Sequence, residues 1–184
     1  MKTLLAVVLV GLAVSSFADG RVIDLAKVKN PVLSAHVDGK PAAAPEGTSV
    51  AVTETGVKLD CNFTSAGHDA AMFSFDVDEP AFTSLTMSYT VSDGRQVAFV
   101  ILTDANGESH YFKSGPVNSN RRQEKKLAIK EKNDHPGEYF ATRWGGDDNQ
   151  RIDWPVKKIT LGINDTPDTF TGDVKATFHS LTLE

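Results

Sequence analysis

The sequence of 184 residues has little cysteine: Cys61 stands alone, so no disulfide can form within the chain. Small exported domains often depend on disulfides, whereas this chain must rely on the burial of apolar side chains. Cys61 alternates in phase with Val57, Leu59 and Phe63, which places these side chains on one face of a strand. We therefore expect a buried structural thiol rather than a nucleophile.

Basic residues are also scarce, with 19 Lys and Arg against 24 Asp and Glu and a formal net charge of −5. A general nucleic-acid-binding protein would carry a basic surplus, so the composition argues against that class. Hydrophobic residues make up 40% of the chain, which at this length is enough for one domain with one core.

The local motifs of the common enzyme classes are missing. The sequence contains no Gly-x-Ser-x-Gly elbow, His-Glu-x-x-His pair, phosphate-binding glycine loop or dinucleotide fingerprint. The five histidines lack the short spacing of a local metal pair, and we expect them at the surface or at a rim. They are His36, His68, His110, His135 and His179. An active site gathered from distant strands stays open, although the balance favours a protein that is not an enzyme.

The longest apolar run, from Leu4 to Val14, lies near the N-terminus and follows Lys2. The small residues of Ser16-Phe17-Ala18 come next, which completes the pattern of a signal peptide. The run is too short to span a bilayer permanently. We expect cleavage after Ala18, which leaves residues 19–184 as one secreted or periplasmic domain, from a bacterium, without membrane insertion.

Apolar and polar residues alternate with a period of two through most of the remaining sequence. Such runs predict strands with one buried and one polar face, and turn signals such as Asn106-Gly107 separate them. The predicted strands are 22–25, 49–53, 57–63, 73–77, 85–91, 97–102, 109–113, 159–163 and 174–183. Many short strands around one core predict an all-β fold, an antiparallel β-sandwich of the jelly-roll type.

Some segments depart from this alternation. Residues 97–102 are apolar throughout, which predicts a central strand covered on both faces. The stretch Gly39–Gly47, with Pro41 and Pro45, is expected to be a surface loop. In the last strand the apolar phase slips, which predicts a β-bulge near His179-Ser180.

A basic segment covers residues 121–132, but its apolar residues are consecutive and make no helical stripe. A short strand with Leu127 and Ile129 pointing inward fits better. The favoured interpretation is a charged edge strand that discourages aggregation between sheets. The alternative is a site for a polyanion such as a uronate or sulfated glycan.

The stretch 139–155 is the richest in binding chemistry, because it combines both tryptophans with Gly145-Gly146 and a run of acids and amides. An indole offers a flat apolar platform to the C–H face of a sugar, while carboxylates, amides and guanidinium groups hydrogen-bond its hydroxyls. We expect Trp144 to be exposed in this polar loop and Trp154, which precedes a strand, to fill the core. The candidate ligand-binding residues are Trp144, Tyr139, Arg143, Asp147, Asp148 and Asn149.

The C-terminal part of the chain resembles the galactose-binding-like jelly rolls, the non-catalytic carbohydrate-binding modules found beside bacterial polysaccharide hydrolases. The resemblance covers roughly the last fifty residues and rests on Arg143–Gly146, Asp153–Pro155, Ile159–Asn164, and the closing strand Gly172–Leu183. It implies a jelly-roll fold, no catalysis, and a polysaccharide or oligosaccharide as the ligand.

The same resemblance implies a structural calcium ion between the first and last strands, although no cofactor is required for binding. The matching carboxylates are those of Asp24 and Asp173, helped by Asp165 or Asp168. Calcium takes six to eight oxygen ligands, which loops rich in Asp can supply. An Asp that follows a Gly is also ordinary turn chemistry.

The leading hypothesis is an exported, non-catalytic domain that stacks a glycan on Trp144. The second is a structural or protein-interaction domain outside the cytoplasm that has no sugar ligand. The third is a small polysaccharide lyase or hydrolase whose catalytic groups come from separate strands.

Overall fold

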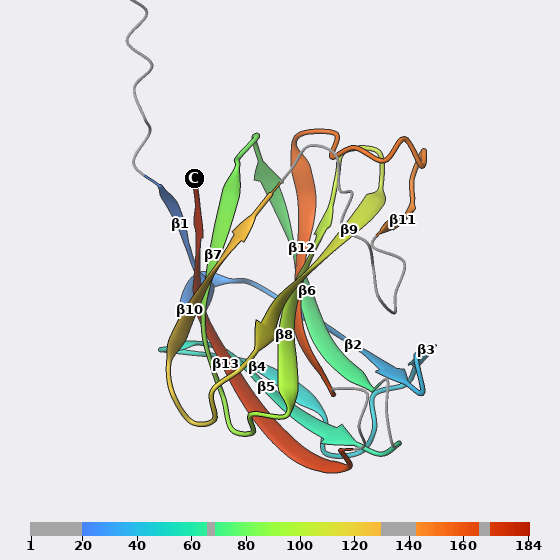
Figure 1. The fold of residues 1–184 in the computed structure, drawn as a ribbon, viewed down its shortest axis with the longest axis vertical. Coiled ribbons are helices and arrows are strands. Elements are labelled where there is room, and N and C mark those ends of the chain that lie inside the picture. The colour runs from blue at the N-terminus through green and yellow to red at the C-terminus, as the bar shows by residue number, and fades with distance from the viewer. Residues whose placement is uncertain (1–19, 66–68, 130–142, 166–169) are drawn as a thin grey trace, which may run out of the picture.

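The computed structural model describes residues 20–65, 69–129, 143–165 and 170–184, which form two antiparallel β-sheets packed face to face (Figure 1). The expected signal peptide, Tyr139 and Asp168 lie outside the described residues. The one helical element within them is a 3-10 turn, η1 (Leu25–Lys27). None of the helical structure described is long and apolar enough to cross a membrane. The predicted antiparallel sandwich of the jelly-roll type is confirmed.

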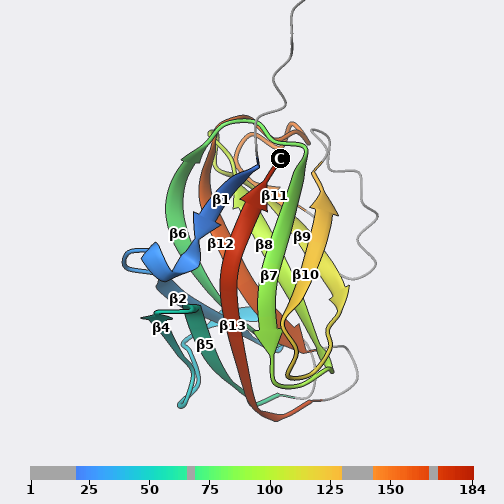
Figure 2. The ribbon, with the colours of Figure 1, turned by 90° about the vertical axis from the view of Figure 1, so that its left-hand side faces the viewer.

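The first sheet has the strand order β10-β7-β13-β5-β4, with β1 paired to β13 (Figure 2). Its strands are β1 (Arg21–Asp24), β4 (Ser49–Thr53), β5 (Gly56–Phe63), β7 (Ser84–Val91), β10 (Gln123–Ala128) and β13 (Gly172–Leu183). The predicted bulge is confirmed, because the pairing of β13 with β7 shifts register between Phe178 and Ser180. The basic segment supplies the edge strand β10, in which Leu127 packs against the core, and Ile129 just beyond the strand is buried, as predicted.

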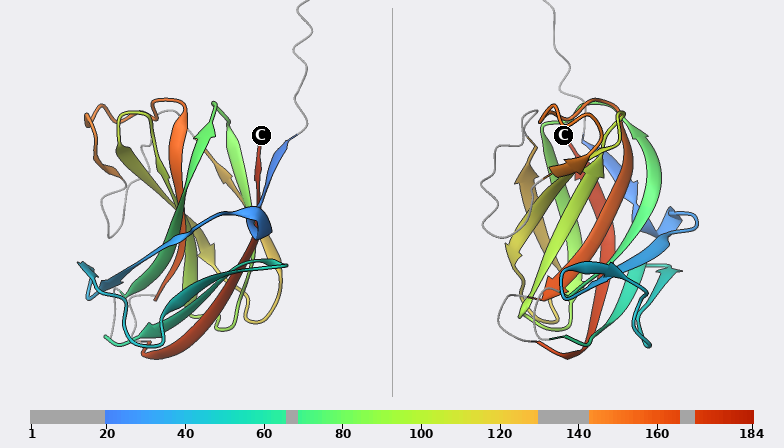
Figure 3. Two further views of the ribbon diagram at one scale, coloured as in Figure 1. Left: turned by 180° about the vertical axis from the view of Figure 1, so that it is seen from behind. Right: turned by 90° about the vertical axis from the view of Figure 1, so that its right-hand side faces the viewer.

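The second sheet has the order β11-β9-β8-β12-β6-β2-β3 (Figure 3). Its strands are β2 (Val32–Val37), β3 (Lys40–Ala42), β6 (Ala70–Glu79), β8 (Gln96–Thr103), β9 (Glu108–Pro116), β11 (Arg143–Gly145) and β12 (Val156–Asp165). The expectation of a loop over Gly39–Gly47 was wrong for its first part, because β3 pairs with β2. Pro41 is tolerated there because β3 is an edge strand, where one side of the ladder needs no donor.

The main core lies between the sheets and is built by the inward residues of the alternating strands. Phe73 of β6 and Phe178 of β13 meet across it, with ring centroids 5.6 Å apart. Cys61 is 1% exposed, so the predicted buried thiol is confirmed, and burial raises its pKa. This core holds the two sheets together through the inward-facing side chains of their strands.

The outer face of the second sheet carries a smaller apolar cluster. Val100 of β8 belongs to the main core, so the alternation of the strand turns Phe99 and Ile101 to the other face. There they pack with Ala70, Met72 and the partly buried Tyr111. Strand β8 is therefore covered on both faces, as its continuous apolar sequence predicts.

Candidate functional site

Trp144 lies on β11, at the edge of the second sheet, where it pairs with Ser109 of β9. The residue is 46% exposed, which confirms the predicted open indole. The prediction that Trp154 packs in the core is also confirmed. It packs against the main core, and its ring contacts that of Phe82 edge-on with centroids 4.9 Å apart. The two tryptophans of this segment thus have different roles, one at the surface and one in the packing.

The Gly145-Gly146 pair allows the chain to fold tightly over the start of β9. Both glycines have positive φ, 79° and 58°, which side chains rarely adopt. A Cβ atom on Gly146 would lie 2.4 Å from the backbone nitrogen of Glu108. The glycine pair therefore lets two segments of the chain itself approach each other closely.

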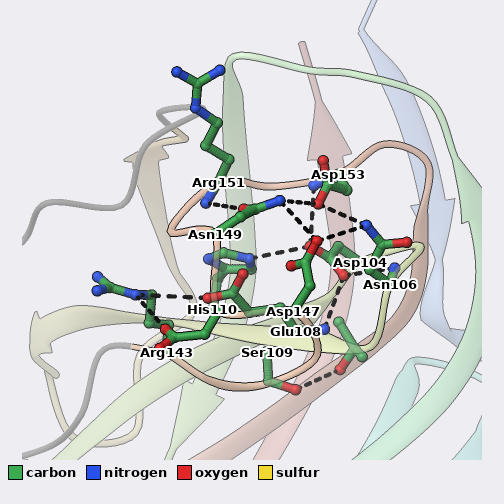
Figure 4. Close-up of polar contacts among 12 residues, drawn as sticks. Asp104, Asn106, Glu108, Ser109, His110, Arg143, Asp147, Asn149, Arg151 and Asp153 are labelled. Atoms are coloured by element: carbon green, nitrogen blue, oxygen red, sulfur yellow. Dashed lines mark hydrogen bonds and ion pairs between the residues drawn. The ribbon is translucent and has the colours of Figure 1, made fainter.

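The amide of Asn106 ties the loop 147–153 to the turn between β8 and β9, and the amide of Asn149 braces the loop from within (Figure 4). Asn106 Nδ2 donates to Asp147 Oδ2 at 3.2 Å and to Asp153 Oδ2 at 3.0 Å. Asn149 Nδ2 donates to the same two oxygens, at 3.1 and 2.6 Å. The loop beside Trp144 is thus held in place by polar contacts.

Arg143 connects this loop to the sheet. Its Nε lies 3.6 Å from Glu108 Oε1 and 3.6 Å from Asp148 Oδ1. The structure thus brings the described ligand-binding candidates into one region at the edge of β9. They are Arg143, Trp144, Asp147, Asp148 and Asn149. Tyr139, the remaining candidate, is not among the described residues.

Beneath the loop lies a buried group that the sequence interpretation missed, formed by Asp104, Glu108 and His110. The expectation that the histidines lie at the surface or a rim was wrong for His110, which is 0% exposed. A local signal was present: Glu108 and His110 share the inward phase of the core residue Phe112. Only the fold shows that Asp104, at the other end of the turn, joins them.

The carboxylate of Asp104 is well supplied with donors. Its Oδ1 accepts the backbone N–H groups of Asn106 and Glu108, both at 2.9 Å. Its Oδ2 accepts the backbone N–H of Asp153 at 3.0 Å and lies 3.4 Å from His110 Nε2. Asp104 therefore organises the turn from inside.

The carboxylate of Glu108 is equally buried, but neither of its oxygens has a hydrogen-bond partner. Burial raises the pKa of Glu108, and Asp104, Asp147 and Asp148 raise it further, against an opposing effect of His110. One ligand atom from each of Asp104, Glu108 and His110 lies within 4.8 Å of the others. These side chains are a group that could hold a metal ion.

The acids expected to bind calcium do not lie together. Asp24 pairs with Ser180, whereas Asp173, seven residues earlier on β13, pairs with Asn62. At the rise of a β-strand this separation is roughly 20 Å. The Asp24 carboxylate instead accepts the Ala26 N–H at 3.1 Å and pairs with Lys27 at 3.0 Å. Asp165 lies at the end of β12, in the other sheet.

No protein-family model and no curated protein matches the sequence. Among solved structures, the chain is similar to a family 11 carbohydrate-binding module from Clostridium thermocellum, in complex with a β-1,3-1,4-mixed-linked tetrasaccharide. The TM-score is 0.55 at 11% identity, covering 89% of this chain and 94% of that one. The chain shares the fold of carbohydrate-binding modules. The family 11 module of the C. thermocellum cellulosomal cellulase Lic26A-Cel5E gives a TM-score of 0.51 at 12% identity, with the same coverage.

Proposed function

We propose that the protein is a non-catalytic carbohydrate-binding domain that stacks a glycan on Trp144. The observation that carries this proposal is the open indole on an edge strand of a rigid sheet, bordered by exposed acids and an amide. The C–H face of a sugar ring can lie on the indole, while carboxylate and amide groups bind the hydroxyls at its edge. The shared fold of the carbohydrate-binding modules supports the same conclusion.

The glycan continues from Trp144 across the outer face of the second sheet. Trp144 lies opposite Ser109, so Tyr111, two residues further along β9, is its diagonal neighbour at about 7 Å between backbones. The Tyr111 ring is fixed against Phe99, with centroids 5.2 Å apart, and its hydroxyl lies 3.5 Å from Asn164 Nδ2. Ser109 adds a hydroxyl, hydrogen-bonded to that of Thr103 at 3.0 Å. The surface next to Trp144 thus combines an aromatic ring with polar groups.

The polar groups of the loop orient the sugar. Asp147 and Asn149 are exposed and hydrogen-bonded to each other, and Asp147 also accepts a hydrogen bond from Asn106 of the turn below, so little ordering is needed when a ligand binds. Asp148 is held by Arg143 and presents an exposed carboxylate. Tyr139 belongs to the proposal as a second aromatic platform.

The proposal includes export, with residues 1–18 acting as a cleaved signal peptide and residues 19–184 as the binding domain. N-terminal sequencing of the protein produced in its native host tests this point. A mature chain that begins at Asp19 is expected, and a retained Met1 would contradict export by this route.

Isothermal titration with soluble glycans, beginning with mixed-linked β-1,3-1,4-glucan, tests the binding function. Trp144→Ala should lower affinity by at least about tenfold, as the loss of a stacking aromatic does in binding sites. The control is Val52→Ala, which trims an exposed apolar side chain on β4 of the other sheet and should bind like wild type. Failure of the wild type to bind any glycan on an array would overturn the proposal and favour a protein-interaction domain. Release of reducing ends or unsaturated uronates would show an enzyme instead.

A further inference from the structure

We propose that Asp104, Glu108 and His110 form a binding site for one divalent transition-metal ion of the zinc class, beneath the loop 147–153. Asp104 ends the β8 side of the turn, while Glu108 and His110 are the inward residues at the start of β9. The side chains therefore come from a single hairpin, whose geometry is fixed by backbone pairing. The inference concerns a buried position and does not depend on glycan binding.

The spacing of the side chains suits a small cation. Bonds of about 2.0–2.1 Å to a tetrahedral ion place its ligand atoms about 3.3 Å apart. His110 Nε2 and Asp104 Oδ2 are 3.4 Å apart, long for a hydrogen bond but close to that separation. Because the three ligand atoms already lie within 4.8 Å of one another, a small inward movement of the Glu108 carboxylate completes the set.

An independent observation points to a missing ligand. Glu108 is 0% exposed, and neither of its carboxylate oxygens has a hydrogen-bond partner. His110 is equally buried, and its Nε2 faces Asp104 Oδ2 at 3.4 Å. Buried polar atoms are nearly always satisfied in native proteins, and a bound ion is one of the few explanations for an exception. A buried carboxylate without a donor, beside Asp104 and His110, is difficult to explain by packing.

The charge around the position favours a cation. The acids Asp104, Glu108, Asp147, Asp148 and Asp153 gather there. Among the described side chains, Arg143 forms an ion pair with Glu108: its Nε lies 3.6 Å from Glu108 Oε1 and makes no hydrogen bond to it. In Figure 4 the guanidinium of Arg151 points away from the group. A divalent ion would compensate the acidic excess more completely than Arg143 alone.

The donor set separates zinc from calcium. An imidazole with two carboxylates suits Zn²⁺ and its neighbours in the first transition row, whereas Ca²⁺ requires six to eight oxygen ligands. Asp104 Oδ1 accepts two backbone N–H groups, and Oδ2 accepts one. These bonds hold the carboxylate in position, as supporting contacts do in metal sites. The position is also distinct from the strand-end acids Asp24 and Asp173.

Titration of the full-length mature protein with ZnCl₂, after dialysis against EDTA, tests the site by calorimetry and by thermal unfolding. One zinc ion per chain is expected to bind, with a rise in the unfolding midpoint of about 5–10 °C at a zinc concentration of about 100 Kd. Glu108→Gln and His110→Gln should each lower zinc affinity by about 100-fold or more, since even supporting residues cost 10–100-fold. The matched control, Glu124→Gln on the exposed face of β10, should bind zinc like wild type.

Each alternative outcome has a definite meaning. Absence of saturable zinc binding to wild type, or equal binding by wild type, Glu108→Gln and His110→Gln, overturns the site. Calcium binding that is tighter than zinc binding overturns the choice of ion. Should either variant fail to fold, the visible spectrum of Co²⁺ bound to wild type decides, because four-coordinate Co²⁺ absorbs far more strongly than the six-coordinate ion. Glycan binding measured in EDTA separates failure of this site from failure of the proposed function.

Discussion

Asp69 and Glu108 are buried carboxylates in the same molecule, yet their surroundings differ sharply. Asp69 is 1% exposed and accepts hydrogen bonds from the N–H groups of Asp38, Thr64 and Ser65, at 2.9, 2.8 and 2.9 Å, and from the Ser65 hydroxyl. Glu108 is 0% exposed and accepts none. The region around Asp69 supplies donors, whereas the region around Glu108 supplies further acids. Burial alone therefore does not identify the role of a charged side chain; its partners do.

Substitution of Asp69 should have the largest effect on stability. Asp69→Asn removes the negative charge that strengthens these hydrogen bonds, and it places an amide N–H₂ group opposite backbone N–H donors. The free energy of unfolding should therefore fall by about 3–4 kcal/mol. The matched change Glu108→Gln, measured in EDTA, should alter it by no more than about 1 kcal/mol, because no hydrogen bond is lost. Urea denaturation measures both. Equal losses would erase the distinction between the two carboxylates.

The contact between the glycine pair and β9 should give the next largest effect. In Gly146→Ala the new Cβ would lie 2.4 Å from the Glu108 nitrogen, so the loop must move and stability should fall by about 2–3 kcal/mol. Gly107→Ala is the control, because its φ of 84° is similarly unfavourable but no atom lies within 4 Å of the new Cβ. The cost there should be about 1 kcal/mol. Thermal unfolding compares them, and a control that costs as much as Gly146→Ala would assign the effect to φ alone.

The pH dependence of stability sharpens the contrast for Asp69. Burial by itself raises the pKa of Asp69, but the hydrogen bonds from Ser65, Asp38 and Thr64 outweigh it and lower the pKa below the ordinary value of 3.8. The stabilisation is therefore complete above the unfolded pKa and is lost as the pH falls through the lower folded pKa. The difference in unfolding free energy between wild type and Asp69→Asn should shrink below about pH 3.8. A difference that stays constant from neutral to acid pH would contradict this account.

The fold was largely predictable because alternation is a local property. The patterns of β5, β7 and β13 are visible in the sequence, and even the bulge after Phe178 follows from a slip in phase. Strand β11 was not predictable, since its three residues, which include Gly145, carry no periodicity and owe their pairing to β9. The short strand β3 contains Pro41, which indicates a loop unless the strand is known to lie at an edge.

The surface part of the candidate site was predictable, but its buried part was not. Exposure of Trp144 follows from its glycine and acidic neighbours, which are adjacent in the sequence. The meeting of Asp104 with Glu108 and His110 depends on a turn, and Asn106 of that turn contacts Asp147 and Asp153 from another segment. Such convergence is set by tertiary structure, which alternation does not report.

A partly exposed carboxylate completes the comparison and should give the smallest effect. Asp93 accepts hydrogen bonds from the backbone N–H of Arg95 at 2.9 Å and from its Nε and Nη2 at 3.0 and 2.7 Å. These contacts lower its pKa, much as donors do for Asp69, but the Arg95 side chain is 62% exposed and water can replace most of them. Asp93→Asn should therefore cost only about 0.5 kcal/mol in urea denaturation. A loss near that of Asp69→Asn would show that the number of donors, rather than their burial, sets the stability contributed by a carboxylate.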